Sequence, residues 1–79
     1  MSPTIFRVKG YRFFFFSREE PRMHVHVVSQ DGEAKYWLEP RIELAKNFKL
    51  TDAQLNEISK IIEEHYDELA NAWKEHFSR

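Results

Sequence analysis

The sequence predicts an α+β domain, in which a small antiparallel β-sheet of about four to five short strands precedes one long or kinked C-terminal α-helix packed on one sheet face. Two patterns predict it. Aromatic and β-branched residues gather in short runs over the first half, whereas from residue 52 apolar residues recur every three or four positions. The length of 79 residues, with 42% hydrophobic residues, indicates a single domain over residues 1–79.

Turn signals separate the expected strands. Lys9 and Gly10 divide the first two strands, and Asp31 with Gly32 is a hairpin signal between the third and fourth. Pro40 interrupts pairing after the fourth, because proline has no amide hydrogen to donate. The strands are expected at residues 5–8, 11–16, 23–29, 34–38 and 41–45, with a loop over 17–22; a helical turn is the alternative for the last strand.

The helix is expected to run from residue 52 to Phe77. Thr51 and Gln54 have the spacing of a capping box, in which each residue satisfies a backbone amide of the other. A single helix and two helices with a kink near His65 are both compatible with the pattern. The apolar stripe consists of Leu55, Ile58, Ile62, Tyr66, Leu69, Trp73 and Phe77.

Several classes of protein are excluded by composition. The absence of cysteine rules out disulfides, thiolate metal sites and a cysteine nucleophile. Two glycines are too few for a glycine-rich phosphate loop. No apolar run is long enough to span a membrane, and no secretory signal is evident, so we expect a cytoplasmic protein without a cofactor.

Charge is distributed unevenly along the chain. Residues 1–30 carry five basic and two acidic groups, a net charge of +3, and residues 31–79 carry seven basic and eleven acidic groups, a net charge of −4. The total of −1 differs from the strongly basic balance of most polyanion-binding domains. The basic front half nevertheless allows an anionic partner at one end of the molecule.

His24 and His26 are the most distinctive pair. Two residues apart on a strand, their side chains leave the same sheet face, opposite to Val25 and Val27. We favour a polar sheet face over a metal site, because a competent site needs a third ligand such as Glu33 or Glu39.

The histidine pair has a second functional interpretation. Together with Arg12 and Arg22 it could hold an anion or an RNA phosphate, and histidine near neutral pH can act as a general acid or base. His24 and His26 are therefore the candidate catalytic residues, although whether the protein is an enzyme stays open.

The run of four phenylalanines predicts a strand with apolar side chains on both faces. Phe13 and Phe15 point to one side and Phe14 and Phe16 to the other, while one helix layer covers only one face of so small a sheet. In the preferred register Phe14 and Phe16 face solvent, and Trp37 lies on the histidine face. We rank a core role for the run first, a protein interface second and a nucleic-acid surface third.

Several short motifs occur in a familiar order along nearly the whole chain: GYRFFFFS at 10–17, EP at 20–21, HVHV at 24–27, AKYWLEP at 34–40, IELAKN at 42–47, and a final helix with Glu68, Leu69 and Trp73. Together they resemble a bacterial family of small proteins, domain of unknown function 4160. The family usually has a second proline before the histidine pair, where this chain has Arg22 and Met23. The resemblance implies a compact α+β fold and a neighbour-encoded partner from another family, numbered 2442, in an arrangement of the toxin–antitoxin type. It implies no established activity.

The leading hypothesis is a small interaction protein, one component of a two-protein module, that forms a homodimer or a heterodimer with a neighbour-encoded protein. The alternative is an RNA-binding protein or small ribonuclease that uses His24, His26 and nearby arginines; a metal-binding protein is the second alternative. The candidate binding residues are Arg12, Arg18, Arg22, Phe14, Phe16, Trp37 and Glu39.

Overall fold

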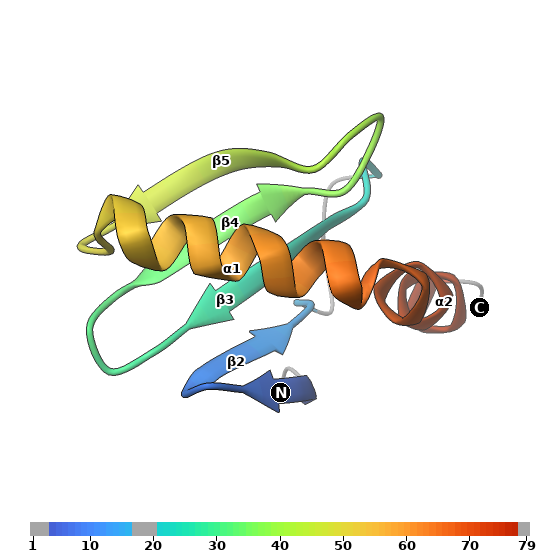
Figure 1. The fold of residues 1–79 in the computed structure, drawn as a ribbon. Helices are drawn as coiled ribbons and strands as arrows, with labels where there is room; N and C mark the ends of the chain where they lie inside the picture. The colour runs from blue at the N-terminus through green and yellow to red at the C-terminus, as the bar shows by residue number, and fades with distance from the viewer. Residues whose placement is uncertain (1–3, 17–20, 78–79) are drawn as a thin grey trace.

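One antiparallel sheet and two helices make up the protein, as a computed structural model that describes residues 4–16 and 21–77 shows (Figure 1). Each strand pairs with its neighbours in sequence, in the order β1-β2-β3-β4-β5. The elements are β1 (Thr4–Val8), β2 (Tyr11–Phe14), β3 (His24–Val28), β4 (Glu33–Trp37), β5 (Glu43–Phe48), α1 (Asp52–Glu64) and α2 (Tyr66–Phe77). The predicted α+β class is confirmed.

Two turns depend on the two glycines. Lys9 and Gly10 both have positive φ, 52° and 83°, between the paired residues Val8 and Tyr11. Two left-handed residues give a tight hairpin whose twist matches that of its strands. A Cβ on Gly32 would lie 2.1 Å from the carbonyl oxygen of Phe48, so only glycine lets the β3–β4 turn approach the end of β5 this closely.

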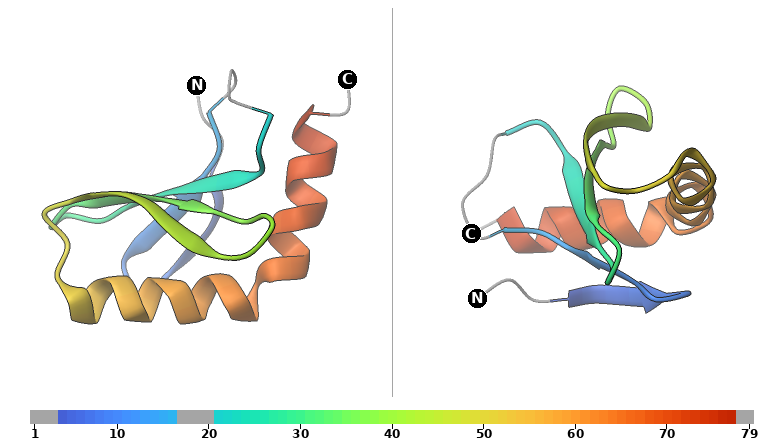
Figure 2. Two further views of the ribbon diagram at one scale, coloured as in Figure 1. Left: turned by 90° about the horizontal axis from the view of Figure 1, so that it is seen from above. Right: turned by 90° about the vertical axis from the view of Figure 1, so that its left-hand side faces the viewer.

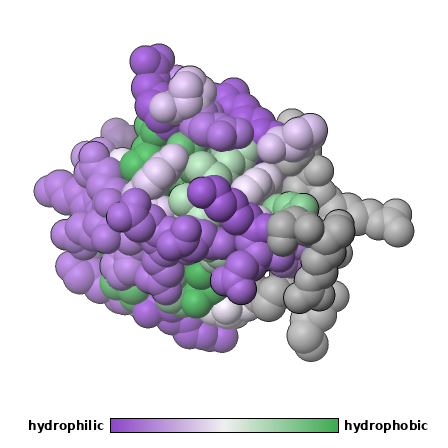
Figure 3. Space-filling view, turned by 90° about the vertical axis from the view of Figure 1, so that its right-hand side faces the viewer, coloured by the Kyte–Doolittle hydropathy of each residue, from purple (hydrophilic) through white to green (hydrophobic). Residues whose placement is uncertain are grey.

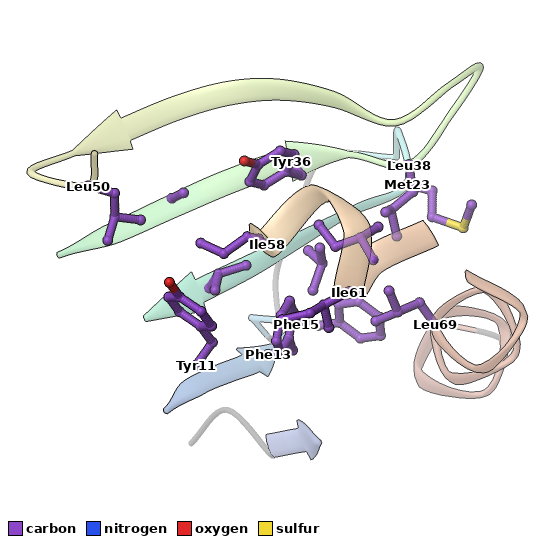
Figure 4. Close-up of a cluster of buried hydrophobic side chains, with 14 residues drawn as sticks. Tyr11, Phe13, Phe15, Met23, Tyr36, Leu38, Leu50, Ile58, Ile61 and Leu69 are labelled. Atoms are coloured by element: carbon purple, nitrogen blue, oxygen red, sulfur yellow. The ribbon is translucent and has the colours of Figure 1, made fainter. Parts of the chain in front are cut away.

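The core lies between one face of the sheet and α1, whose axis crosses the strands (Figures 1 and 4). Phe13, Val25 and Val27 are at most 1% exposed, which confirms the predicted face for these strands. Ile58, Ile61 and Ile62 project from α1 toward them. Burial of each such side chain contributes about 1.5–3 kcal/mol to folding.

The helical segment breaks at His65, as the kinked alternative predicts. The predicted capping box is also present, with the Thr51 hydroxyl accepting from the Gln54 amide at 3.1 Å. After His65 the chain turns sharply, and α2 runs past the end of the sheet toward its other side (Figure 2). The His65 ring stacks on Phe6 of β1 at 4.5 Å, which fixes the corner against the sheet. No helix in the described part of the chain is long and apolar enough to cross a membrane.

Three tyrosine hydroxyls connect the sheet with the helices. Tyr36 donates to the Leu55 carbonyl at 2.9 Å, Tyr66 to the Leu38 carbonyl at 2.9 Å, and Tyr11 to the Glu57 carboxylate at 3.0 Å. Burial raises the pKa of Tyr36 to about 12, because the phenolate would lose its hydration. Burial, followed by the bond to the Glu57 carboxylate, also raises the pKa of Tyr11.

Both edge strands contain a residue that breaks the pairing register. In β1, Ile5 lies between Thr4 and Phe6, which pair with consecutive residues of β2 in reverse order. In β5, Ala45 is skipped between Leu44, opposite Tyr36, and Lys46, opposite Lys35. The strand expected over 41–45 exists, but it begins at Glu43 and continues to Phe48.

Candidate interaction surface

The sheet face turned away from α1, here called the outer face, is the candidate functional surface. Strand pairing places its side chains in rows across the sheet, because residues opposite each other in the ladder project to the same side. One row is Arg7, Arg12, Val28, Glu33 and Phe48; the next is Thr4, Phe14, His26, Lys35 and Lys46; the third is His24, Trp37 and Glu43.

A groove of about 590 Å³ follows the first two rows. Its walls include two of the large exposed apolar side chains, Phe16 with 44% and Phe48 with 60% of its surface accessible. The other lining residues are Arg12, Phe14, His26, Val27, Val28, Glu33, Ala34, Lys35, Lys46 and Asn47. Apolar surface rimmed by charged groups is typical of binding sites.

Cations already lie over the aromatic rings of this face. The Arg12 guanidinium is 4.6 Å from the centre of the Phe14 ring, and the Lys49 ammonium is 5.3 Å from that of Phe48. Trp37 has two such neighbours, with Arg22 at 4.2 Å and Lys35 at 4.5 Å. These cation–π contacts hold positive charge on the outer face.

Two pairs of like charges lie directly opposite each other on neighbouring strands. Arg7 of β1 faces Arg12 of β2, and Lys35 of β4 faces Lys46 of β5. Like charges in such cross-strand positions destabilise a sheet. The only acidic side chain among the groove residues is Glu33, so the outer face is positively charged along its groove.

The predicted histidine pair divides into one buried and one partly accessible side chain. His26 lies on the outer face as expected, with its ring 4.2 Å from that of Phe16. His24 projects to the same side but is 0% exposed, because α2 passes the end of the sheet and brings Trp73 to 5.2 Å from its ring. Removal of the His24 ring would therefore leave a cavity, in contrast to the open polar face expected for the pair.

Hydrogen bonding fixes the tautomer of His24. Its Nδ1 lies 2.7 Å from the carbonyl oxygen of Arg22, and since a carbonyl can only accept, Nδ1 carries the hydrogen. A catalytic role for the His24 and His26 pair would require Trp73 and Trp37, both within 5.6 Å of the His24 ring, to move aside.

The predicted binding residues Arg22, Trp37 and Glu39 gather at one end of the outer face. Arg22 stacks on Trp37 and donates from Nε to the Glu39 carbonyl at 2.8 Å, and one of its terminal nitrogens is 3.8 Å from Glu43. The Glu39 carboxylate accepts from the Met23 amide at 3.0 Å. Arg18 lies outside the described residues.

Of the predicted outward-facing pair, only Phe16 is open to solvent. Phe14 is on the expected side but only 9% exposed, because Arg12, Phe16 and His26 surround its ring. The groove residues that sequence reasoning missed include Lys35, Lys46 and Phe48. Alternation of Lys46 with Phe48 was the available signal, but the strand was expected to end before them.

A metal centre has no counterpart in the described residues, where no three His, Asp or Glu side chains are grouped to hold an ion. The Glu39 carboxylate, one of the expected third ligands, is bonded to the Met23 amide instead. Seen from the side of α2, the surface is mostly hydrophilic, with apolar residues in small patches (Figure 3).

Comparison with known proteins agrees with the motifs in the sequence. No curated protein and no solved structure matches the chain. One family model does, described as "Domain of unknown function (DUF4160)", and it matches residues 10–74. This span contains β2 to β5, α1 and most of α2, and with them every residue that lines the groove. The chain belongs to the DUF4160 family.

Proposed function

We propose that the protein is an interaction domain, one half of a two-protein module, and that it binds its partner through the outer face of the sheet. The observation that carries the proposal is the groove of about 590 Å³, to which Phe16 and Phe48 contribute large exposed apolar side chains. Association would remove this apolar surface from water. Such burial is favourable by about 25 cal/mol of free energy for each Å² of apolar surface. The family resemblance favours a neighbour-encoded partner in an arrangement of the toxin–antitoxin type.

Co-purification from cells that retain the adjacent genes tests the proposal. A tagged wild-type chain is expected to retain one partner in fixed stoichiometry, and Phe48→Ser is expected to lose it. Leu44→Ser is the matched control, because Leu44 is on the same strand, is 42% exposed and pairs with the core residue Tyr36, on the other sheet face. Equal retention by both folded variants would contradict the proposal.

RNA binding is the second candidate function, favoured by the three cations Arg12, Lys35 and Lys46 along the groove. In this case His26, which is accessible beside Phe16, would contact the ligand, and the neighbouring His24 ring, 5.2 Å away, would support it from the side. Binding of a labelled single-stranded RNA, measured at several salt concentrations, tests this function. Affinity should fall steeply with salt and should decrease in His26→Ala; an unchanged affinity in this variant would exclude the histidine from the contact.

A further inference from the structure

A single residue makes the break between α1 and α2. His65 has a φ of −112° and a ψ of 18°, whereas its neighbours Glu64 and Tyr66 are helical (Figure 2). Rotations of about 50° in φ and about 60° in ψ would give it standard helical angles. His65 therefore has the position of a hinge, because the conformation of this one residue decides whether residues 52–77 form two helices or one.

The local sequence does not explain the break. Helices commonly end at a glycine or asparagine, in a basic last turn, or shortly before a proline. The last turn of α1 has no basic residue, and residues 61–69 include no glycine, asparagine or proline. The apolar stripe from Leu55 to Phe77 also continues through the break with the spacing of one uninterrupted helix. We infer that contacts between α2 and the rest of the chain hold the two helices at an angle.

These contacts lie at the end of the sheet, at a place here called the α2 docking site. It consists of Phe15, His24 and Leu38. The Trp73 ring is 5.2 Å from the rings of both Phe15 and His24, and the Tyr66 hydroxyl donates to the Leu38 carbonyl at 2.9 Å. Each contact joins α2 to a residue that precedes the hinge in the chain, so the α2 of a second copy can make the same contacts.

A straightened helix would carry α2 away from its own docking site. Residues 52–77 as one helix would be about 39 Å long, which exceeds the longest dimension of the fold, 36 Å. In a single chain this would expose Leu69, which is 0% exposed in the closed form, and would uncover the docking site. A second straightened copy removes both costs, because each α2 then occupies the docking site of the other copy.

We propose that two copies of this chain exchange their α2 helices, with His65 straightened and residues 52–77 forming one helix in each copy. The partner is a second copy because its α2 reproduces the contacts that hold α2 in the single chain. Among the described residues, none from α2 lines the outer-face groove. The inference therefore goes beyond the proposed function, and an exchanged dimer would present two such grooves.

Substitution of the hinge residue tests the proposal. His65→Ala and His65→Gly both remove the ring, but alanine favours a continuous helix and glycine opposes it. After refolding from urea at about 1 mM chain, sedimentation should detect a dimer of the wild type. The association constant should be at least about tenfold larger for His65→Ala than for His65→Gly, because the hinge straightens in both copies. Insertion of two glycines after His65 should give monomer, which keeps the test decisive if His65→Gly does not fold.

Lys60 provides the matched control. It is exposed on α1 and is helical in the closed form and in the exchanged form alike. Lys60→Ala and Lys60→Gly should therefore differ in stability but have equal association constants. A mixed sample of isotopically labelled and unlabelled chains identifies the exchange directly. Its dimer should show nuclear Overhauser contacts between Trp73 of one copy and Phe15 of the other.

Three results would overturn the proposal. The first is a wild-type chain that stays monomeric after refolding at about 1 mM. The second is equal association of His65→Ala and His65→Gly, and the third is a dimer without contacts between Trp73 and Phe15 of different copies; either would place the dimer contact on another surface. The proposed function fails on a different result, equal retention of a native partner by Phe48→Ser and Leu44→Ser.

Discussion

The two faces of the sheet are formed by the same strands but differ in how far their side chains are buried. The face under α1 is closed, since Phe13, Val25 and Val27 have almost no contact with water and the Tyr36 hydroxyl bonds to the helix backbone. The outer face combines partly covered rings with opposed cations. The first arrangement stabilises the chain by itself, whereas the second leaves the large apolar side chains of Phe16 and Phe48 partly exposed to water. The difference separates the part of the protein that folds it from the part available for binding.

Truncation of one phenylalanine on each face tests most directly whether the two faces differ in their contribution to stability. Phe13→Ala should lower the free energy of unfolding by about 3–5 kcal/mol, because Phe13 is fully buried. Phe16→Ala should cost less than about 1 kcal/mol, because nearly half of the Phe16 side chain is already in water. Urea unfolding of both variants measures the difference, and similar losses would mean that both faces support the fold equally.

The two histidines of β3 are expected to differ in how much they stabilise the fold. His24→Ala should destabilise the protein by about 2–4 kcal/mol, because it opens a cavity beneath Trp73 and removes the bond to the Arg22 carbonyl. His26→Ala should cost about 1 kcal/mol or less. Thermal or urea unfolding of the two single variants measures both values. If His24→Ala is as stable as His26→Ala, the contact between α2 and the end of the sheet is not formed in solution.

Alkaline pH offers a test specific to the closed face. The pKa of Tyr36 is about 12 in the folded chain and about 10 in the unfolded chain. The contribution of the neutral Tyr36 side chain to the free energy of unfolding is therefore complete below about pH 10. It declines between about pH 10 and 12, because only the unfolded chain loses the proton readily there. The loss over this window should approach about 2–3 kcal/mol. Tyr36→Phe should be less stable than wild type near pH 8, having lost a bond to Leu55, and should lose less stability on going to pH 12. Parallel losses in the two proteins would show that Tyr36 ionises freely in the folded state.

The smallest expected effect concerns β5. Phe48→Ser and Leu44→Ser should each change the free energy of unfolding by no more than about 0.5 kcal/mol, since both side chains are largely exposed. Unfolding curves collected together with the binding experiments check this. A large loss for Phe48→Ser alone would mean that the groove wall supports the fold, and its effect on binding would then need another variant.

Local patterns were sufficient to predict most of the fold. Alternation assigned Val25 and Val27 to the core face and His26 to the outer face, and the Thr51 capping box marked the start of α1. Periodicity located the helical segment, and the break at His65 was one of two expected outcomes. These features depend on residues near each other in the chain, which is why sequence alone contains them.

The incorrect details depend on distant or irregular pairing. Burial of His24 follows from the turn at His65, which carries Trp73 around the end of the sheet. Ala45 interrupts the period of two in β5, so the sequence signal for the strand ended there although the strand continues to Phe48. The opposition of Lys35 and Lys46 could not be predicted, because it requires the register of β4 against β5.

The irregular residues of the two edge strands bear on how large an assembly can become. An open sheet can in principle be extended by further strands, and unbroken edges of this kind template fibres. Ile5 in β1 and Ala45 in β5 each disturb the regular spacing of the edge, and Arg7 and Lys46 add charge to it. Addition of further strands to β1 and β5 is therefore disfavoured. A complex formed through the outer face is expected to contain a fixed number of chains.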